Sequence, residues 1–390
     1  MSAPLDHLAA ARVAAPDLLG FLQRLVDCES PTFEKEMCDR VGEMAATQAD
    51  LLGVTPSVAR EERFGDVVLA RTSTGHPEPV RVLLVGHLDT VFDAGTVAER
   101  PYTERDGRAH GPGVFDMKAG IAIGLWATHL ANAAVADDAG ARGLDVTFFM
   151  NCDEECGSPD SRRQLANVAP GHDLVLVLEP GQAGPAITIG RKGVGIFRFD
   201  VTGAEAHAGA DPDGGVNSIL DLAQRIPRIA ALADRPLGTT VNVGVVNGGT
   251  YPYVVPGSSA AQIDVRVPTQ AEAGRVEEGF LALASDTFVP GARCELSGNF
   301  HRPPLEPTDD SRRFAALYQA AAASLGYQVG TASSGGASDG NLTAAMGIPT
   351  LDGLGADGAH AHSPKEYIDL TTVPQRLASL TGLLVALATA

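Results

Sequence analysis

Histidine and acidic side chains follow three strand-length apolar segments of this 390-residue chain. The segments are Val80 to Gly86, Asp145 to Asn151 and Asp173 to Glu179. The side chains at their ends are His87 and Asp89, then Glu154 and Glu155, then Glu179. Because the carboxyl ends of parallel strands meet at one edge of a sheet, we expect these groups to gather there. Carboxylates at one edge repel one another unless cations neutralise them, so the pattern predicts a pair of divalent metal ions.

Two further motifs supply candidate ligands. Asp116 lies in GPGVFDMKAG, a glycine-rich turn that enters a predicted helix, where an acidic residue ordinarily caps the helix. The motif GAHAHSPKEYIDL supplies His360 and His362 after the candidate strand Ile348 to Leu351, and the residues alone leave the choice between the two histidines open. Imidazole nitrogen and carboxylate oxygen suit zinc best, and cobalt or manganese less often. The sequence therefore predicts a zinc centre first.

The elements that must position these side chains are typical of an α/β fold. Nearly continuous apolar runs such as VRVLLVG indicate strands that are covered on both faces, as in a parallel sheet. Helical spacing of apolar residues predicts a helix over Met117 to Ala134. Further helices are predicted over Pro16 to Asp27, Arg312 to Leu325 and Thr372 to Thr389. The alternation predicts a three-layer α/β catalytic domain with a mostly parallel sheet.

The stretch from about Gly193 to Gly298 has a different pattern. IFRFDVTG and AQIDVRVP alternate apolar with polar residues, as half-exposed antiparallel strands do, and helices are predicted over Val216 to Leu232 and Gln270 to Ser285. We expect an inserted α+β domain with a four-stranded sheet and two helices. The expected domains are a catalytic metal-binding domain of residues 1–190 and 300–390 and an inserted domain of residues 191–299. Gly/Pro-rich segments, Pro180 to Gly193 and Gly298 to Pro307, should cross between them.

The charge balance and the cysteines limit the class of protein. Lys and Arg number 29 against 48 Asp and Glu, which gives a formal charge of −19, so nucleic acid and anionic membranes are not expected as partners. No segment reaches the roughly 18 to 20 apolar residues of a membrane span, and the N-terminal segment lacks a signal pattern. Five cysteines are an odd count that suits reduced thiols. We therefore expect a cytoplasmic protein without disulfides.

Seven motifs in order along nearly the whole chain resemble those of one enzyme family. The motifs are GHLDTV, GPGVFDMKAG, NCDEECGS, VLEP, the AHAG of Ala206 to Gly209, the GGASDG of Gly335 to Gly340, and His362 with Ser363. Together they resemble the dizinc metallopeptidases that include glutamate carboxypeptidase, acetylornithine deacetylase, succinyl-diaminopimelate desuccinylase and the aminoacylases. The chain looks most similar to the glutamate carboxypeptidase branch.

The resemblance implies a role for each candidate residue. One metal would be bound by His87, Asp116 and Glu179, and the other by Asp116, Glu155 and His362, with Asp116 bridging. Such a metal pair lowers the pKa of a water and polarises the scissile carbonyl. Glu154 is adjacent to the ligand Glu155, which leaves its own carboxylate free to act as general base, and the resemblance makes Asp89 the acid that orients the His87 imidazole. It also implies that His207 reaches across an interface to the active site of a second copy, so we expect a homodimer built through the inserted domain.

The resemblance also implies where substrate binds. Arg266 and Arg302 match positions that meet substrate carboxylates, a task that suits the planar guanidinium, although Arg266 could equally form a salt bridge within its strand. Tyr253 in YPYVVP stands where many relatives carry Asn, which leaves glutamate specificity open. The predicted function is hydrolysis of an amide bond adjacent to a free carboxylate, in a small molecule or short peptide. An N-acyl-amino-acid amidohydrolase or deacetylase and a dipeptidase are the alternatives.

Two rival interpretations remain at this point. Cys152 and Cys156 flank the acid pair and could serve a cysteine hydrolase together with a histidine. They do not form a structural zinc knuckle, because no second cysteine pair completes four ligands. The other rival is a catalytically silent binding module on the same fold, against which the complete set of proposed ligands and the base Glu154 argue.

Overall fold

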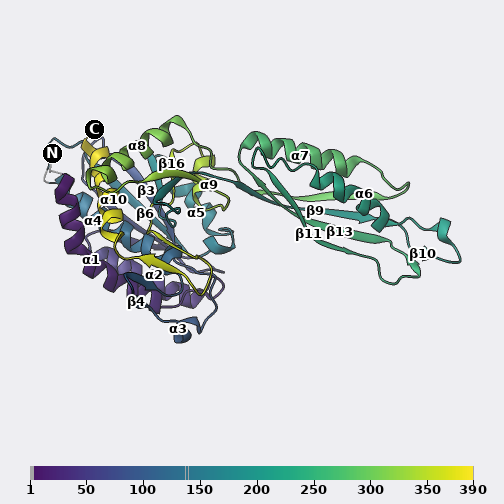
Figure 1. Cartoon of the computed structure of the whole chain (residues 1–390), viewed down its shortest axis with the longest axis horizontal. Helices are drawn as coiled ribbons and strands as arrows, with labels where there is room; N and C mark the ends of the chain where they lie inside the picture. The colour runs from purple at the N-terminus through teal and green to yellow at the C-terminus, as the bar shows by residue number, and fades with distance from the viewer. Residues whose placement is uncertain (1–3, 137, 139, 390) are drawn as a thin grey trace. The chain divides into compact units, whose positions relative to one another are not determined.

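The computed structural model describes residues 4–136, 138 and 140–389, and the chain divides into two compact units (Figure 1). The first unit comprises Met1–Gly190, Pro307–Ser334 and Ser338–Ala390. The second comprises Arg191–Glu306 and Gly335–Ala337. Each unit has its own sheet and its own hydrophobic core.

The main sheet of the first unit has six strands in the order β1-β2-β6-β3-β7-β16. Their bounds are Thr55–Ala59, Val67–Ser73, Leu144–Asn151, Val80–His87, Leu174–Val177 and Thr350–Leu351 in that order. The strands β6, β3, β7 and β16 are parallel, and β1 and β2 are antiparallel additions at one edge. The mostly parallel sheet predicted from the apolar runs is confirmed.

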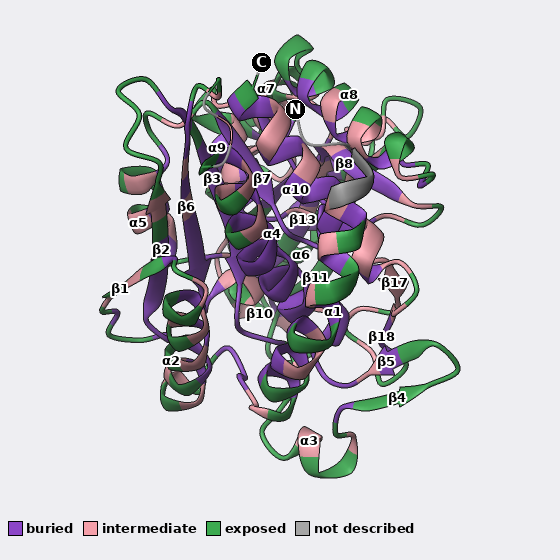
Figure 2. Ribbon diagram, turned by 90° about the vertical axis from the view of Figure 1, so that its left-hand side faces the viewer, coloured by how far each residue is buried: buried purple, intermediate pink, exposed green. Residues whose placement is uncertain are grey.

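Helices cover both faces of this sheet. Successive side chains of a strand point to opposite faces, so a strand that is apolar throughout contributes to a core on each side. In β3, Val82 and Leu84 belong to one core cluster, and Leu83 and Val85 belong to another. The first cluster is covered by α1 (Pro4–Asp27), α2 (Lys35–Leu51), α4 (Ala119–Ala136), α8 (Asp309–Ser324) and α10 (Val373–Thr389). The second is covered by α5 (Ser161–Val168) and α9 (Gly340–Ala345). The result is the predicted three-layer arrangement, with buried strands between outer helices whose outward faces are exposed (Figure 2).

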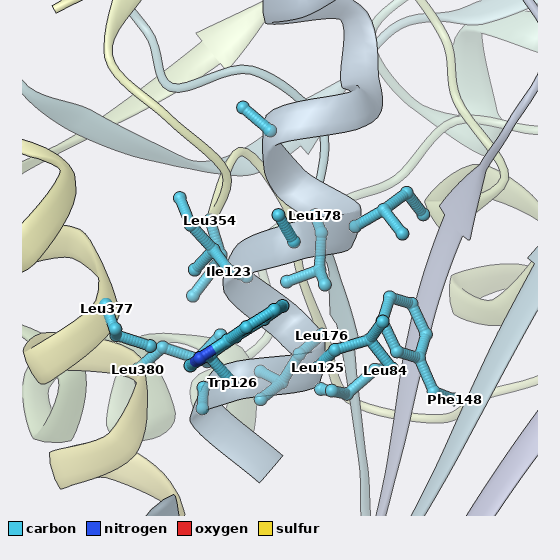
Figure 3. Close-up of a cluster of buried hydrophobic side chains, with 14 of the residues drawn as sticks. Leu84, Ile123, Leu125, Trp126, Phe148, Leu176, Leu178, Leu354, Leu377 and Leu380 are labelled. Atoms are coloured by element: carbon cyan, nitrogen blue, oxygen red, sulfur yellow. The ribbon is translucent and has the colours of Figure 1, made fainter. Parts of the chain in front are cut away.

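The helix α4 lies in the centre of the larger core, where Trp126 packs among leucines of the sheet and of α10 (Figure 3). A side chain at Gly120 would meet the backbone oxygen of Leu178 at 2.0 Å, so only glycine allows this approach of helix and strand end. The expectation that no segment is long and apolar enough for a membrane span was wrong, because Val114–Ala136, alone among the helices of the described residues, passes by length and composition. Its largely buried side chains are those of a core helix.

The second unit contains a four-stranded antiparallel sheet in the order β11-β13-β9-β14. The strands are Thr240–Gly248, Ser258–Val267, Gly193–Thr202 and Arg293–Arg302, and the helices are α6 (Ser218–Ala230) and α7 (Gln270–Ser285). Phe197, Phe199 and Phe280 form edge-to-face pairs in the core between the sheet and the helices. The predicted α+β unit with four strands and two helices is confirmed. A short pair, β10 (Ala206–His207) with β12 (Val254–Val255), extends from it.

Smaller elements complete the described chain. The first unit also contains α3 (Thr96–Glu99), β4 (Thr103–Arg105), β5 (Arg108–His110), β15 (Gly330–Ser334), β17 (Gly358–Ala359) and β18 (Tyr367–Asp369). The strand β8 (Ala186–Arg191) lies within the Gly/Pro-rich segment Pro180 to Gly193, where the chain passes from the first unit to the second. The helix predicted from Pro16 begins at Pro4, because the alanine-rich residues before Pro16 favour helix strongly.

Candidate metal centre

The strand β3 lies between β6 and β7, and all three are parallel. His87 is the last residue of β3, opposite Asn151 at the end of β6. Glu154 and Glu155 follow β6 in a single helical turn, and Glu179 comes two residues after β7. The structure thus brings these side chains to one edge of the sheet, because adjacent parallel strands end side by side.

Asp116 reaches the same edge from the turn that enters α4. The sequence pattern alone suggested that its side chain caps this helix. The Asp116 carboxylate contacts His87 and His362 instead. The carboxylate of Glu366 accepts three backbone N–H groups of the turn, at 3.1 Å from Gly113, 2.8 Å from Phe115 and 3.0 Å from Asp116. Gly113 has a φ of 72°, and a side chain there would meet Thr90 at 2.5 Å, so the turn requires glycine. The carboxylate of Asp116 faces the sheet edge, where it contacts His87 and His362.

Asp116 contacts two histidines, one through each carboxylate oxygen. Nε2 of His87 lies 3.2 Å from Oδ1 of Asp116, and Nε2 of His362 lies 3.2 Å from Oδ2. Each histidine also meets a second acid: His87 lies 3.6 Å from Oε1 of Glu179, and His362 lies 3.1 Å from Oε2 of Glu155. The five residues therefore form two groups of three that share Asp116.

The hydrogen bonds of His87 show that the cluster needs positive charge. Nδ1 of His87 lies 3.0 Å from the backbone oxygen of Asp89, which can only accept, so Nδ1 carries a proton. Nε2 then faces the carboxylate oxygens of Asp116 and Glu179, which also only accept. A second proton or a cation between Nε2 and these oxygens resolves the conflict.

Contacts with acids raise the pKa values of the two histidines, and contacts with the histidines lower that of Asp116. Burial acts to lower the pKa of His87, but hydrogen bonds to Asp116 and Asp89 outweigh it and raise that pKa well above its usual range. Hydrogen bonds to Asp116 and Glu155 raise the pKa of His362 to about 10. Burial acts to raise the pKa of Asp116, but the two histidines hold it well below its usual range. The cluster therefore holds positive charge strongly.

The donor set fits divalent metal ions. The buried Oε1 of Glu155 has no hydrogen-bond partner among the described residues, and a buried acceptor of this kind calls for a partner. Ligand atoms of two overlapping trios lie within 4.8 Å of one another, His87 with Glu154 and Glu179, and His87 with Asp116 and Glu155. Imidazole nitrogens and carboxylate oxygens at such spacing are suited to zinc.

Asp89 contacts both the His87 imidazole and the backbone of the acid pair Glu154 and Glu155. Its carboxylate is fully buried and lies 3.4 Å from Nδ1 of His87, farther than its own backbone oxygen. The same carboxylate accepts hydrogen bonds from the backbone N–H of Glu154 at 3.3 Å and of Glu155 at 3.2 Å, and from Thr32 at 2.8 Å. Asp89 therefore orients the acid pair as well as the imidazole.

Of the two C-terminal histidines, the structure brings only His362 to the cluster. The ring of His360 lies beside Tyr367, with ring centres 6.0 Å apart. Both histidines have positive φ angles, 66° for His360 and 60° for His362, so the choice between them depends on the path of the loop and not on local conformation.

The other predicted site residues belong to the second unit. His207 on β10 is exposed, and its Nδ1 accepts the backbone N–H groups of Gly209 and Ala210 at 3.1 Å. Arg266 forms the salt bridge within its strand that was one of its two expected roles, at 3.0 Å from Asp264. Arg302 is buried at the end of β14. Tyr253 is exposed and stacks on Tyr251, with ring centres 5.3 Å apart.

The cysteines beside the acid pair are poorly suited to nucleophilic attack. A hydrogen bond to Cys38 and burial raise the pKa of Cys152 well above its usual range. Burial raises the pKa of Cys156 to about 12. Because the thiolate is the reactive form, these environments argue against the cysteine hydrolase.

Sequence reasoning missed Glu366 and Thr32. Glu366 lies four residues after His362 in SPKEYIDL, and its burial at 1% exposure is unusual for an acid. Its partners lie about 250 positions earlier in the chain, as the separations of its hydrogen bonds show. No local sequence signal marks such a contact.

Comparison with known proteins agrees with this geometry. The family model described as peptidase family M20/M25/M40 matches residues 83–386. Carboxypeptidase G2 of Pseudomonas sp. (strain RS-16) is 27% identical over 376 residues, covering 94% of this chain and 88% of that protein. A tripeptidase structure from Staphylococcus aureus has a TM-score of 0.77 at 20% identity, covering 96% of this chain and 99% of that one. A dinuclear metal binding peptidase of Bacillus subtilis has a TM-score of 0.69 at 18% identity, covering 97% and 99%.

Proposed function

Because the chain belongs to peptidase family M20/M25/M40, a family of dinuclear metal hydrolases, we propose that it cleaves an amide bond adjacent to a free carboxylate, as a carboxypeptidase does. The observation that carries this proposal is the position of Asp116. Its two carboxylate oxygens face two different histidines, and each histidine meets a further acid. A carboxylate shared in this way is suited to bridging two ions.

In this proposal the ions are divalent, zinc first, with cobalt or manganese as alternatives. One would be held by His87, Asp116 and Glu179, and the other by Asp116, Glu155 and His362. When bound, such a pair supplies Lewis-acid polarisation of the scissile carbonyl and a water of lowered pKa. Glu154 takes a proton from the attacking water and returns it to the leaving amine. Asp89 fixes the backbone of Glu154 for this task.

The substrate proposal rests on the second unit. Arg302 and Arg266 would bind the free carboxylate of a small molecule or short peptide, because the guanidinium matches a carboxylate with two donors. Tyr253 presents an exposed phenol stacked on Tyr251. A phenol offers a single donor and lacks the paired donor and acceptor of the Asn amide, so glutamate specificity stays open and an N-acyl-amino-acid amidohydrolase, deacetylase or dipeptidase is the alternative.

We further propose a homodimer built through the second unit. The strand β11 is an edge strand of its sheet and exposes Val245 and Val246, at 45% and 52%. An edge strand with exposed apolar side chains favours pairing with another chain. In such a dimer, His207 would act in the partner's active site by stabilising the oxyanion.

The five free cysteines are compatible with the cytoplasmic location expected from the sequence.

A substrate panel with controlled metal content tests the proposed function. The chain is stripped with a chelator, reloaded with zinc, cobalt or manganese, and assayed on folate-like compounds, N-acyl amino acids and dipeptides. We expect activity that is lost on chelation, returns on reloading, and requires a free carboxylate beside the cleaved bond. Inactivity over the whole panel with both ions bound would favour the binding module. Activity that survives chelation and is abolished by thiol alkylation would favour the cysteine hydrolase.

A further inference from the structure

Glu366 is a buried acid with an unusual set of partners. Its side chain is 1% exposed, and its two carboxylate oxygens accept three backbone N–H groups, from Gly113, Phe115 and Asp116. Asp116 is the carboxylate shared by both histidines of the cluster. Glu366 therefore accepts a hydrogen bond from the main chain of Asp116, the acid that both histidines share.

The turn before α4 presents three backbone N–H groups to a single carboxylate. The N–H groups of Gly113, Phe115 and Asp116 precede α4, which begins at Ala119, and the Glu366 carboxylate supplies their acceptor. Beside the left-handed Gly113, the N–H groups of Gly113, Phe115 and Asp116 converge on one point, and such a concave arrangement binds a carboxylate well. Asp116 lies in this turn, but a capping side chain accepts N–H groups two or three residues after its own position, so the three N–H groups that Glu366 accepts are not those that Asp116 would cap.

We propose that Glu366 is a positioning residue that keeps the side chain of Asp116 available for the metal pair. Because Glu366 accepts the N–H groups of Asp116 and of its neighbours in the turn, it fixes the main chain from which the Asp116 carboxylate reaches His87 and His362. Glu366 also lies only four residues after His362, so one short segment fixes both the shared acid and one of its histidines. The role rests on the two-metal function proposed above.

The segment that carries Glu366 is held in place by contacts other than its carboxylate. Tyr367 in β18 pairs with His110 in β5. Nδ1 of His110 lies 3.2 Å from the backbone oxygen of Glu366, which accepts its hydrogen bond. Replacing the side chain of Glu366 therefore removes the anion from the turn while these contacts still anchor the loop, which makes the role testable.

The test compares Glu366→Gln with a matched control, Glu29→Gln. Glu29 also accepts two backbone N–H groups at a helix start, from Gly95 at 2.9 Å and Val97 at 2.7 Å, but it serves α3 and not the turn of Asp116. Zinc affinity is measured by titration, and Tm is measured in metal-free protein and with zinc added. A purely structural residue would lower both Tm values equally, whereas a positioning residue reduces the rise in Tm that zinc produces.

We expect Glu366→Gln to weaken zinc binding roughly 10- to 100-fold, the range seen for partners that orient metal ligands, and Glu29→Gln to bind zinc as the native chain does. Native zinc affinity in Glu366→Gln would overturn the role of Glu366 alone. A native chain that gains no thermal stability from zinc would overturn the two-metal proposal and this role with it. If Glu366→Gln does not fold, Glu366→Asp decides: weaker zinc binding with a near-native metal-free Tm supports the role, and unchanged zinc binding overturns it.

Discussion

The carboxylate of Asp89 accepts a hydrogen bond from the backbone N–H of Glu154 at 3.3 Å, although the two residues are 65 positions apart. Asp89 follows the strand that ends in His87, and Glu154 follows the neighbouring strand β6. The contact therefore ties the ends of two strands together. It fixes the main chain of the proposed base relative to a proposed metal ligand.

Replacing Glu154 by Gln should remove most turnover while both ions stay bound. The amide keeps the shape of the side chain but cannot take a proton, and general base catalysis contributes about 10²- to 10⁴-fold. The measurement is kcat together with the metal content per chain. Because Glu154 lies within reach of His87 and Glu179, loss of an ion in this variant would show that Glu154 is a ligand and not the base.

Metal uptake at pH 8 should release about two protons per chain, because metal ligands must be deprotonated. Contacts with acids raise the pKa of His362 to about 10 and that of His87 well above its usual range. Both imidazoles therefore bind a proton at pH 8 until an ion displaces it, and the apparent metal affinity should fall as the pH is lowered. Calorimetric titration in two buffers of different ionisation enthalpy measures this release.

A pair of histidine variants controls that experiment. His362→Ala should lower the number of released protons by about one, whereas His360→Ala should leave it unchanged, because His360 lies beside Tyr367 and not in the cluster. Metal uptake by the native chain without proton release would contradict the proposed ligand set.

His207→Ala should slow turnover without changing metal content, because His207 lies in the second unit and is not a ligand. If His207 acts in the partner's active site, a mixture of His207→Ala with Glu154→Gln should regain activity after subunit exchange. The mixed dimer then contains one site with both native residues. Each variant alone serves as the control. Mixed dimers with no more activity than the separate variants would contradict a shared site.

Gly120→Ala should destabilise the first unit by about 1 to 3 kcal/mol, because an added methyl group collides with the Leu178 backbone oxygen. The matched change is Gly274→Ala in the helix α7, where a methyl group meets nothing within 4 Å. That change should stabilise the second unit by about 0.5 to 1 kcal/mol through helix propensity. Urea unfolding followed by Trp126 fluorescence reports on the first unit, and far-UV circular dichroism reports on both. Equal effects of the two substitutions would contradict the packing of α4.

The parts of the site that sequence could predict are those that strands position. His87, Glu155 and Glu179 follow long apolar strands, so the parallel sheet alone brings them to one edge. Asp116 could be interpreted only through the family resemblance, because its local pattern is that of a helix cap. The choice of His362 over His360 depends on the loop path, since both imidazoles offer the same chemistry. Glu366 could not be predicted, because its contact joins segments far apart in the chain.

The number of divalent ions bound per chain tests the central claim most directly. The native chain is stripped with a chelator, reloaded with zinc, freed of excess ions, and analysed for metal against protein concentration. The shared position of Asp116 between His87 and His362 predicts two ions per chain. A folded native chain that retains one ion or none would contradict a two-metal centre.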